Sequence, residues 1–376
     1  MRFARTCWER GAGWVLGCAL GAALALPAQA QWKIGQTVGL TGAVAATSAE
    51  ARQGALLHFE AINRQGGIQG QTIELVTLDD QFEVAKAVEN ARTLIGQGVL
   101  ALFLNRGTPH TQALMPLLAE ARIPLVAPST GAMVLHQPVN PWIFNVRAAY
   151  QREAERAIAH LTQIGVRRIG LVQVDDSFGD DAVQGALKGL KSANLSPVSH
   201  QRYDRAKPDF GAIAPALAKA EPQAVLFIGS GTAVVEGMKA LRAAGSRAQL
   251  VTLSNNASGG FVKQLGEIGR GVIVSQVFPS ERSISVPMVK EAQALARAKG
   301  LELTPAMVEG YAAAKVLAEG LRRAGRSPTR ESLAQALNGL QRFDLGGLEL
   351  SYGSADHSGL DYVDLSIVGE DGRFRR

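Results

Sequence analysis

The sequence predicts an α/β protein with two lobes, each a mainly parallel sheet flanked by helices, and a ligand cleft between the lobes. Two observations lead to this prediction. The chain has 376 residues, 47% of them hydrophobic, whereas single hydrophobic cores stop growing at about 250 to 300 residues. After Gln31, short β-branched runs alternate with longer amphipathic stretches, a rhythm that is typical of βα units and parallel strands.

The first thirty residues have the three sections of a secretory signal. Three arginines precede an apolar stretch at residues 11–26, and Ala28-Gln29-Ala30 supplies a small-residue cleavage site. A transmembrane anchor is the alternative, but the apolar stretch is shorter than the roughly 20 residues that a span needs. We therefore expect cleavage after Ala30 and a mature protein in the periplasm that begins at Gln31.

Both cysteines, Cys7 and Cys18, lie in this N-terminal segment. Lipidation at Cys18 is a weaker alternative, because cleavage there would leave the apolar residues 19–26 on the mature protein. After cleavage at Ala30 no thiol remains to form a disulfide, bind a metal or act as a nucleophile. We expect no metal site and no cofactor.

The first lobe is predicted from four strands that alternate with three helices after Gln31. Gly66 and Gly67 end the first helix, because glycine accepts the left-handed conformation common at helix ends. The expected strands are residues 32–38, 72–78, 99–104 and 123–127, and the expected helices are residues 48–63, 84–97 and 109–121.

A second series of strands begins after Gln151 and predicts the other lobe. Its strands are expected at residues 168–174, 197–203, 223–228, 249–253 and 272–277, with later helices at 285–300, 306–324 and 330–338. Too few strands remain for a third domain, so the last third is expected to return to the first lobe. We assign residues 31–147 and 279–349 to lobe one, and residues 148–278 and 350–376 to lobe two.

Four motifs carry a resemblance to a known family. They are Gly39-Leu40-Thr41-Gly42, Ala61-Ile62-Asn63-Arg64-Gln65-Gly66-Gly67-Ile68, Pro124-Leu125-Val126-Ala127-Pro128-Ser129 and Asp175-Asp176-Ser177-Phe178-Gly179. With these motifs the chain resembles the periplasmic binding proteins of branched-chain amino acid type, the receptors of ABC importers with type I topology. The resemblance implies a monomeric receptor that closes on a small ligand and docks on membrane permease subunits.

The polar clusters of these motifs follow strands at their carboxyl ends, where open α/β sheets place ligands. Thr108-Pro109 predicts a helix start whose free N–H groups and positive dipole end suit a carboxylate. Ser129, Thr130 and Gly131 follow another strand with hydroxyl and backbone donors. In similar receptors the loop at 128–131 and the position of Thr108, next to Gly107, hold the ligand carboxylate. The alternatives are that Thr108 only caps its own helix, and that the polar groups of the loop at 128–131 hydrogen-bond only to one another.

Other candidate ligand contacts come from both lobes. Thr47 and Ser48 stand near the start of the first helix, as ligand contacts or as caps. Phe178 occupies the position of an aromatic residue that packs on the ligand in similar receptors, and Tyr150 is a second aromatic candidate. Ser230 and Asn255, with the neighbouring Asn256, follow strands of lobe two and would face the cleft, although asparagines also favour turns.

Two departures from the family pattern bear on the ligand. Amino-acid receptors of this type usually place an acidic residue in lobe two to pair the ligand ammonium, whereas this chain has Asn255 there, and Gly131 replaces a hydroxyl residue. Because a buried ammonium without an anion is costly, the ligand is expected to be an organic or aromatic acid if it is not an amino acid. Arg106 is a candidate for a second anion contact.

The sequence gives little support to other classes of protein. It has no G-x-G-x-x-G in its first βα turn, no Gly-Lys phosphate loop, no G-x-S-x-G and no H-E-x-x-H, so an enzyme is not expected. The formal net charge of +6 is spread along the chain, which gives no footprint for nucleic acid. A ligand sensor of the same fold, coupled to a signalling or chemotaxis partner, remains the alternative to a transport receptor.

Overall fold

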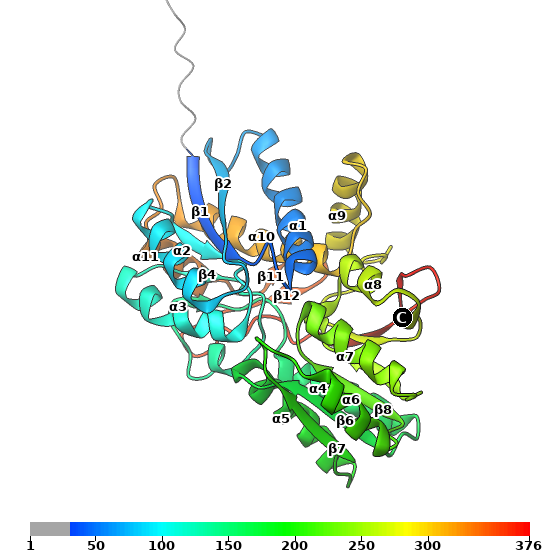
Figure 1. Ribbon diagram of the computed structural model, residues 1–376. Helices are drawn as coiled ribbons and strands as arrows, with labels where there is room; N and C mark the ends of the chain where they lie inside the picture. Colours follow the sequence, from blue (N-terminus) through cyan, green and yellow to red (C-terminus); the bar gives the residue numbers. More distant parts are fainter. Residues whose placement is uncertain (1–30) are drawn as a thin grey trace, which may run out of the picture.

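The computed structural model describes residues 31–376, and these form two lobes (Figure 1). The secretion signal, the lipidation alternative and both cysteines concern residues outside this range. Lobe one contains a five-stranded parallel sheet in the order β2-β1-β3-β4-β5. Its strands are β1 (Gln31–Val38), β2 (Thr72–Asp79), β3 (Ala101–Phe103), β4 (Leu125–Val126) and β5 (Ile143–Phe144).

Both faces of this sheet are covered by helices, because its strands present apolar side chains alternately to the two sides. Ala101 and Phe103 of β3 join one core cluster, and Leu102 between them joins another. The first cluster is closed by α1 (Ala45–Arg64), α9 (Pro287–Ala298), α10 (Pro305–Ala324) and α11 (Arg330–Asn338), and the second by α2 (Val84–Gly96) and α3 (Thr108–Ala121).

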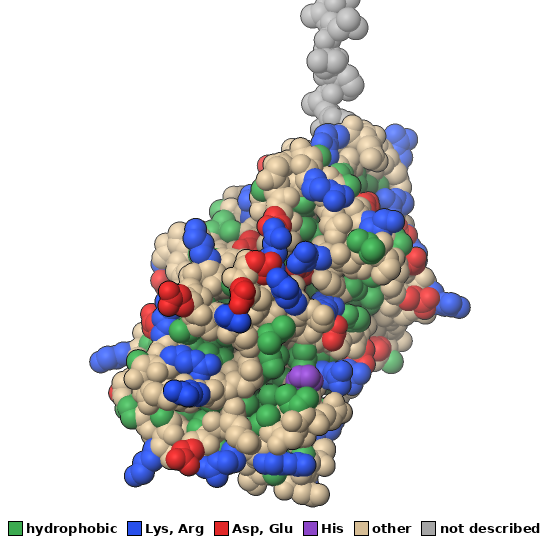
Figure 2. All heavy atoms as spheres, turned by 90° about the vertical axis from the view of Figure 1, so that its right-hand side faces the viewer, with side chains coloured by type: hydrophobic (Ala, Val, Ile, Leu, Met, Phe, Trp, Pro, Cys, Tyr) green, Lys and Arg blue, Asp and Glu red, His purple; other side chains and the backbone are tan. Residues whose placement is uncertain are grey.

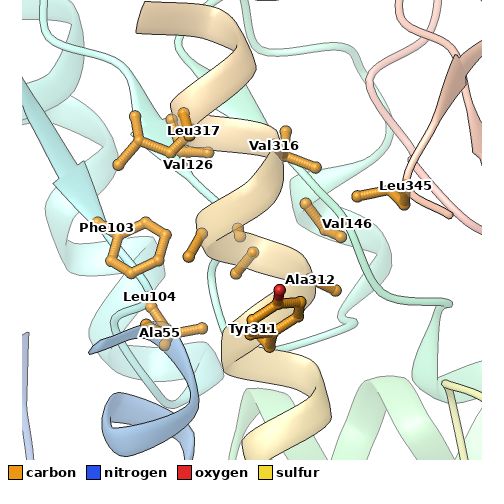
Figure 3. Close-up of a cluster of buried hydrophobic side chains, with 14 of the residues drawn as sticks. Ala55, Phe103, Leu104, Val126, Val146, Tyr311, Ala312, Val316, Leu317 and Leu345 are labelled. Carbon is orange, nitrogen blue, oxygen red and sulfur yellow. The ribbon is translucent and has the colours of Figure 1, made fainter. Parts of the chain in front are cut away.

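Helix α10 lies along the middle of lobe one although it comes from the last third of the chain. Figure 3 shows Tyr311 and Leu317 of this helix among Phe103, Val126 and Val146, which belong to the first third. Helix α10 also packs against α1 with the two backbones in near contact. A Cβ atom added at Gly310 would lie 1.8 Å from the carbonyl oxygen of Ala51, so only glycine fits there.

Lobe two contains a seven-stranded sheet in the order β14-β13-β10-β9-β8-β6-β7. Five strands are parallel, and the two C-terminal strands extend the sheet antiparallel. Every residue of β8 is buried, as expected for a central parallel strand with helices on both faces. The strands are β6 (Ile169–Val174), β7 (Ser199–Tyr203), β8 (Ala224–Ile228), β9 (Gln249–Thr252), β10 (Ile273–Gln276), β13 (Asp364–Val368) and β14 (Phe374–Arg375).

The helices of lobe two enclose a core that includes Phe178, Phe227 and Phe261. They are α4 (Tyr150–Gln163), α5 (Ser177–Ser192), α6 (Phe210–Lys219), α7 (Gly231–Ala243) and α8 (Gly259–Leu265). On the face shown in Figure 2, basic and acidic side chains are interspersed over both lobes. None of the helices within residues 31–376 has the length and apolar character needed to cross a membrane.

The chain passes between the lobes three times. The first passage follows β5 and leads through Arg147 into α4, and the second follows β10 and leads into Phe278, which belongs to the core of lobe one. The third passage lies later than the predicted position near Glu349. Tyr352 and Leu360 still pack in the core of lobe one, and Leu360 N–H donates to the carbonyl of Val146.

The structure confirms the predicted fold class and differs in a few elements. Strand β4 is shorter than the expected strand at 123–127, and β5 was not expected. The pair β11 (Phe343–Asp344) and β12 (Glu349–Leu350) forms a separate two-stranded hairpin in lobe one. Residues 350–360 therefore stay with lobe one, because Tyr352 is buried against the Phe144 ring.

The glycine contact between α1 and α10 predicts the effect of one added methyl group. Gly310→Ala should lower the free energy of unfolding by about 1 to 3 kcal/mol or more, since the methyl meets rigid backbone. Gly96→Ala in α2 is the matched control, because no atom lies within 4 Å of its Cβ position and alanine favours a helix by about 0.5 to 1 kcal/mol. Urea unfolding measures both, and equal stabilities would contradict the prediction.

Candidate ligand-binding site

The carboxyl ends of the two parallel sheets face each other, and the lobes are in direct contact there. Thr232 N–H of lobe two donates to the Ala43 carbonyl at 3.1 Å. The side-chain oxygens of Thr47 and Ser258 are 2.8 Å apart. Glu50 accepts hydrogen bonds from the backbone of Gly259 and Gly260 at the start of α8. The two lobes thus touch one another through α1, α7 and α8.

A second set of contacts between the lobes involves Arg205 of lobe two and Phe82 of lobe one. Arg205 of lobe two forms an ion pair with Asp176, with an N–O distance of 2.5 Å. Its guanidinium carbon lies 5.1 Å from the ring centroid of Phe82 in lobe one, and Phe82 stacks on His110 with 4.5 Å between ring centroids. A cation over an aromatic face is attractive, so this contact favours closure.

The predicted carboxylate loops of lobe one lie side by side. Arg106 and Ser129 are paired as a parallel bridge, and the Thr108 and Thr130 hydroxyl oxygens are 2.8 Å apart. All four residues are buried. The fold therefore brings two hydroxyls, a guanidinium and the N-terminus of α3 into one place between the lobes.

Thr108 does not cap α3, so the predicted capping role is wrong. The N-cap residue is Gly107, with φ of 98°, and no side chain caps this helix end. Thr111, one turn later, donates its hydroxyl to the Gly107 carbonyl. The Thr108 hydroxyl is instead engaged with Thr130, because Gly107 turns the chain sharply before the helix begins. The first N–H groups of α3 consequently have no side-chain partner of their own.

The presence of glycine at position 131 is explained by backbone atoms that crowd its Cβ position. A Cβ atom at this position would lie 2.5 Å from the Ala148 carbonyl oxygen and 2.9 Å from the Tyr150 nitrogen. The Gly131 carbonyl accepts a hydrogen bond from Tyr150 N–H at 2.8 Å. The loop is thereby fixed to the start of α4, and a hydroxyl residue would not fit there.

Tyr150 and Phe178 form an aromatic pair in lobe two. Their ring centroids are 4.6 Å apart, both residues are buried, and the guanidinium of Arg147 lies 4.5 Å from the Tyr150 ring centroid. Phe178 is held at the start of α5 because Asp176 accepts from the backbone N–H groups of Phe178 and Gly179. Burial raises the pKa of the Tyr150 hydroxyl above its ordinary value.

Ser230 and Asn255 meet in lobe two, and Asn255 lies directly beside Arg106 of lobe one. The Asn255 amide donates to the Ser230 hydroxyl at 3.1 Å and to the Gly229 carbonyl at 2.9 Å. Its side-chain oxygen is buried without a partner, and its backbone carbonyl accepts a hydrogen bond from Arg106. Asn256 supports the local backbone instead, since its side chain accepts from Gly231 N–H.

Thr47 and Ser48 occupy the first turn of α1 but do not cap it. The N-cap residue is Val44, without a side-chain cap. Thr47 bonds to Ser258 across the lobes, whereas the buried Ser48 hydroxyl has no hydrogen-bond partner within the described residues. The capping alternative is therefore wrong for both residues, and their part in ligand binding stays a prediction.

Three charged residues that the sequence did not single out complete the site. Arg147 forms an ion pair with Glu153, and its Nη1 lies 3.9 Å from Glu309 of α10. Glu153 also accepts from Ser254 N–H at 2.9 Å and from the Ser275 hydroxyl at 2.5 Å. Only the three-dimensional fold reveals the complete cluster, because Glu309 comes from a distant part of the sequence.

The two buried arginines differ in their electrostatic surroundings. Burial lowers the pKa of Arg106 below its ordinary value. Burial alone would also lower the pKa of Arg147, but its neighbours Tyr150, Glu153 and Glu309 raise it above the ordinary value. Arg147 thus forms an ion pair with Glu153, whereas the hydrogen-bond partners of Arg106 are neutral. No grouping of three or more possible metal ligands exists among residues 31–376.

Together, two lobes in contact and a buried polar site between them are the arrangement of a two-lobed binding protein. Comparison with known proteins agrees with this class. The model of the periplasmic binding protein family matches residues 31–372. The chain therefore belongs to the periplasmic binding protein family, as its motifs predicted, and it is a binding protein and not an enzyme.

Individual relatives support the same assignment. The chain is 24% identical to the Leu/Ile/Val-binding protein homolog 3 of Brucella melitensis over 83% of this chain and 84% of the relative. It is similar to the crystal structure of a substrate-binding periplasmic protein from Ralstonia solanacearum, with 35% identity, a TM-score of 0.84, and coverage of 91% and 99%. A branched-chain amino acid ABC transporter protein from Thermus thermophilus with bound valine shares the fold, with a TM-score of 0.81, 19% identity, and coverage of 92% and 95%.

The Thr108–Thr130 pair predicts how ligand affinity depends on a hydroxyl. Thr108→Val keeps the branched shape but removes the oxygen, so it should weaken binding of a carboxylate ligand about tenfold or more, the value of a lost charge-assisted hydrogen bond. Thr108→Ser keeps the oxygen and should retain most of the affinity. Calorimetry on both variants, after melting scans confirm folding, measures the effect. Unchanged affinity in Thr108→Val would leave the hydroxyl pair with a purely structural role.

Proposed function

We propose that this protein is the extracytoplasmic solute-binding receptor of an ABC importer and that it closes on a small carboxylate-bearing ligand. The single observation that carries the proposal is the buried group of donors between the lobes: the Arg106 guanidinium, the Thr108 and Thr130 hydroxyls, and the N-terminus of α3. Oriented N–H groups, hydroxyls and a cation in a desolvated place are the features that bind a carboxylate.

The relatives support the same ligand class. The similar proteins of Brucella melitensis and Rhizobium johnstonii are named Leu/Ile/Val-binding proteins, and these amino acids carry a carboxylate. Their identity to this chain, 24% and 26%, is low. The proposal therefore extends to organic and aromatic acids as well as amino acids.

We expect the two lobes to close by a hinge motion about the three chain passages that connect them. In an open form the carboxylate loops of lobe one would first receive the ligand, and lobe two would then bring Tyr150, Phe178, Ser230 and Asn255 over it. The contacts of Thr47 with Ser258 and of Arg205 with Phe82 form as the lobes meet. Hinge closure of this kind sequesters small ligands, and the permease subunits would recognise the closed surface.

The proposal predicts that carboxylates stabilise and compact the protein. A bound ligand at 100 times its dissociation constant adds about 2.7 kcal/mol to the free energy of unfolding, which a melting scan with a panel of amino, aliphatic and aromatic acids detects. The best ligand should also lower the radius of gyration in small-angle scattering. Neutral amides of the same acids are the matched controls and should have little effect. A panel without any stabilising carboxylate, or a radius unchanged at saturation, would count against the receptor function.

Export is the second part of the proposal and has its own test. Cleavage after Ala30 should give a periplasmic protein whose intact mass corresponds to a chain that starts at Gln31. Mass spectrometry of the protein from a periplasmic extract measures this. A mass that corresponds to a start at Cys18 with added acyl chains would show a lipid-anchored receptor instead.

A further inference from the structure

The beginning of α1 in lobe one lies against the beginnings of α7 and α8 in lobe two, and glycines allow a close approach there (Figure 1). A Cβ atom at Gly231 would lie 1.7 Å from the Ala43 carbonyl oxygen, and one at Gly260 would lie 2.5 Å from the Ala46 Cβ atom. The three atoms nearest to the Gly260 position all belong to Ala46 and Glu50 of lobe one. Only glycine therefore fits at position 260 while the lobes touch.

Glu50 of α1 binds the backbone of lobe two with both carboxylate oxygens. One oxygen accepts from Gly260 N–H at 2.8 Å, and the other accepts from Gly259 N–H at 3.1 Å. These N–H groups stand at the beginning of α8, where no carbonyl of the helix itself can accept from them. Beside them, the Thr47 and Ser258 hydroxyl oxygens are 2.8 Å apart. Since hydrogen bonds to a carboxylate are stronger than those between neutral groups, Glu50 makes the strongest of these contacts.

The two loops of lobe two that meet α1 also carry candidate ligand contacts. Ser230 directly precedes Gly231, and its hydroxyl accepts from the Asn255 amide. Asn256 ties the two loops together, because its side chain accepts from Gly231 N–H at 2.9 Å and donates to the Gly229 carbonyl at 3.0 Å. The ligand-facing residues and the contact with α1 are thus parts of one hydrogen-bonded unit of lobe two.

We propose that Thr47, Glu50, Ser258, Gly259 and Gly260 form a latch between the lobes, and that Glu50 is the positioning residue through which this latch sets the affinity for the ligand. This inference rests on the proposed function, because the latch acts on affinity only if ligand binding brings the lobes together. A contact made only when the lobes touch adds its free energy to the ligand-bound state. Its loss lowers the apparent affinity of every ligand by the same factor. Because affinity differences between related complexes lie mainly in dissociation, the ligand also leaves faster.

Glu50→Ala tests the latch, because it removes both acceptor oxygens and keeps a residue that favours a helix. The probes are amino, aliphatic and aromatic acids, among them leucine, 4-methyl-2-oxopentanoate, phenylalanine and benzoate. Each acid that binds the unaltered protein should bind the variant about tenfold more weakly, as expected for a lost hydrogen bond to a charged group. Calorimetry measures the affinities, and stopped-flow measurements should show dissociation accelerated by a similar factor.

Glu60→Ala is the control for this variant. Glu60 belongs to the same helix and pairs with Lys299 within lobe one. Its removal should therefore leave affinity and dissociation rate unchanged.

Two neighbouring glycines provide a second test that does not depend on the carboxylate. Gly260→Ala adds a methyl whose nearest obstacle is Ala46 of the opposite lobe, so it should weaken binding about tenfold or more, the range for an overpacked contact. Gly259→Ala adds a methyl whose nearest atoms, in Glu50 and Thr304, lie 3.6 and 3.7 Å away. This second variant should lose much less affinity. Melting scans confirm that both variants fold.

Three outcomes would contradict the latch. Unchanged affinities in a folded Glu50→Ala protein would overturn it and leave the receptor function intact. A loss confined to leucine and phenylalanine, which carry an ammonium group, would show that Glu50 contacts the ligand itself and would likewise overturn the latch. Absence of binding by every acid to the unaltered protein would overturn the proposed function and the latch together.

Discussion

The burial of the Arg147 guanidinium is the constraint on which the ligand-facing part of the molecule depends. An arginine that is 1% exposed keeps its proton, so the fold has to provide a carboxylate. Glu153 does so from the first turn of α4 and also binds Ser254 and Ser275. The first passage between the lobes, the start of α4 and two strand ends of lobe two are thereby held together. The Tyr150 ring, which packs against Arg147, takes its position from this arrangement.

The two buried arginines of the site have different partners. Arg147 forms an ion pair with Glu153, whereas the hydrogen-bond partners of Arg106 are the neutral Ser129 hydroxyl and Asn255 carbonyl. Within the described residues, Arg147 Nε and Nη1 and Glu309 Oε1 are buried without a hydrogen-bond partner. The site therefore contains charged groups of both signs, and Asn255 adds a neutral amide to them.

The βα rhythm of the sequence was sufficient to predict the fold and most element positions, because central parallel strands are continuous apolar runs. Strand β5 was missed because Ile143 and Phe144 form only two paired residues, and the third passage was placed too early because the burial of Tyr352 depends on distant partners. The loops around Thr108 and Ser129 were predicted from strand ends and do lie together. The Arg147–Glu309 contact was beyond prediction, since it joins a passage between the lobes to α10.

The position of α10 has a consequence for the order in which the molecule is built. Lobe one begins the chain, yet the helix that covers its sheet beside Phe103 is synthesised only after most of lobe two. At about 5 to 20 residues per second, that interval lasts on the order of tens of seconds, during which α1 alone of the four helices is present to cover this face of the sheet. Lobe two can gather its five parallel strands first. Both lobes are therefore completed only by the last third of the chain, lobe one by α9, α10 and α11 and lobe two by β13 and β14.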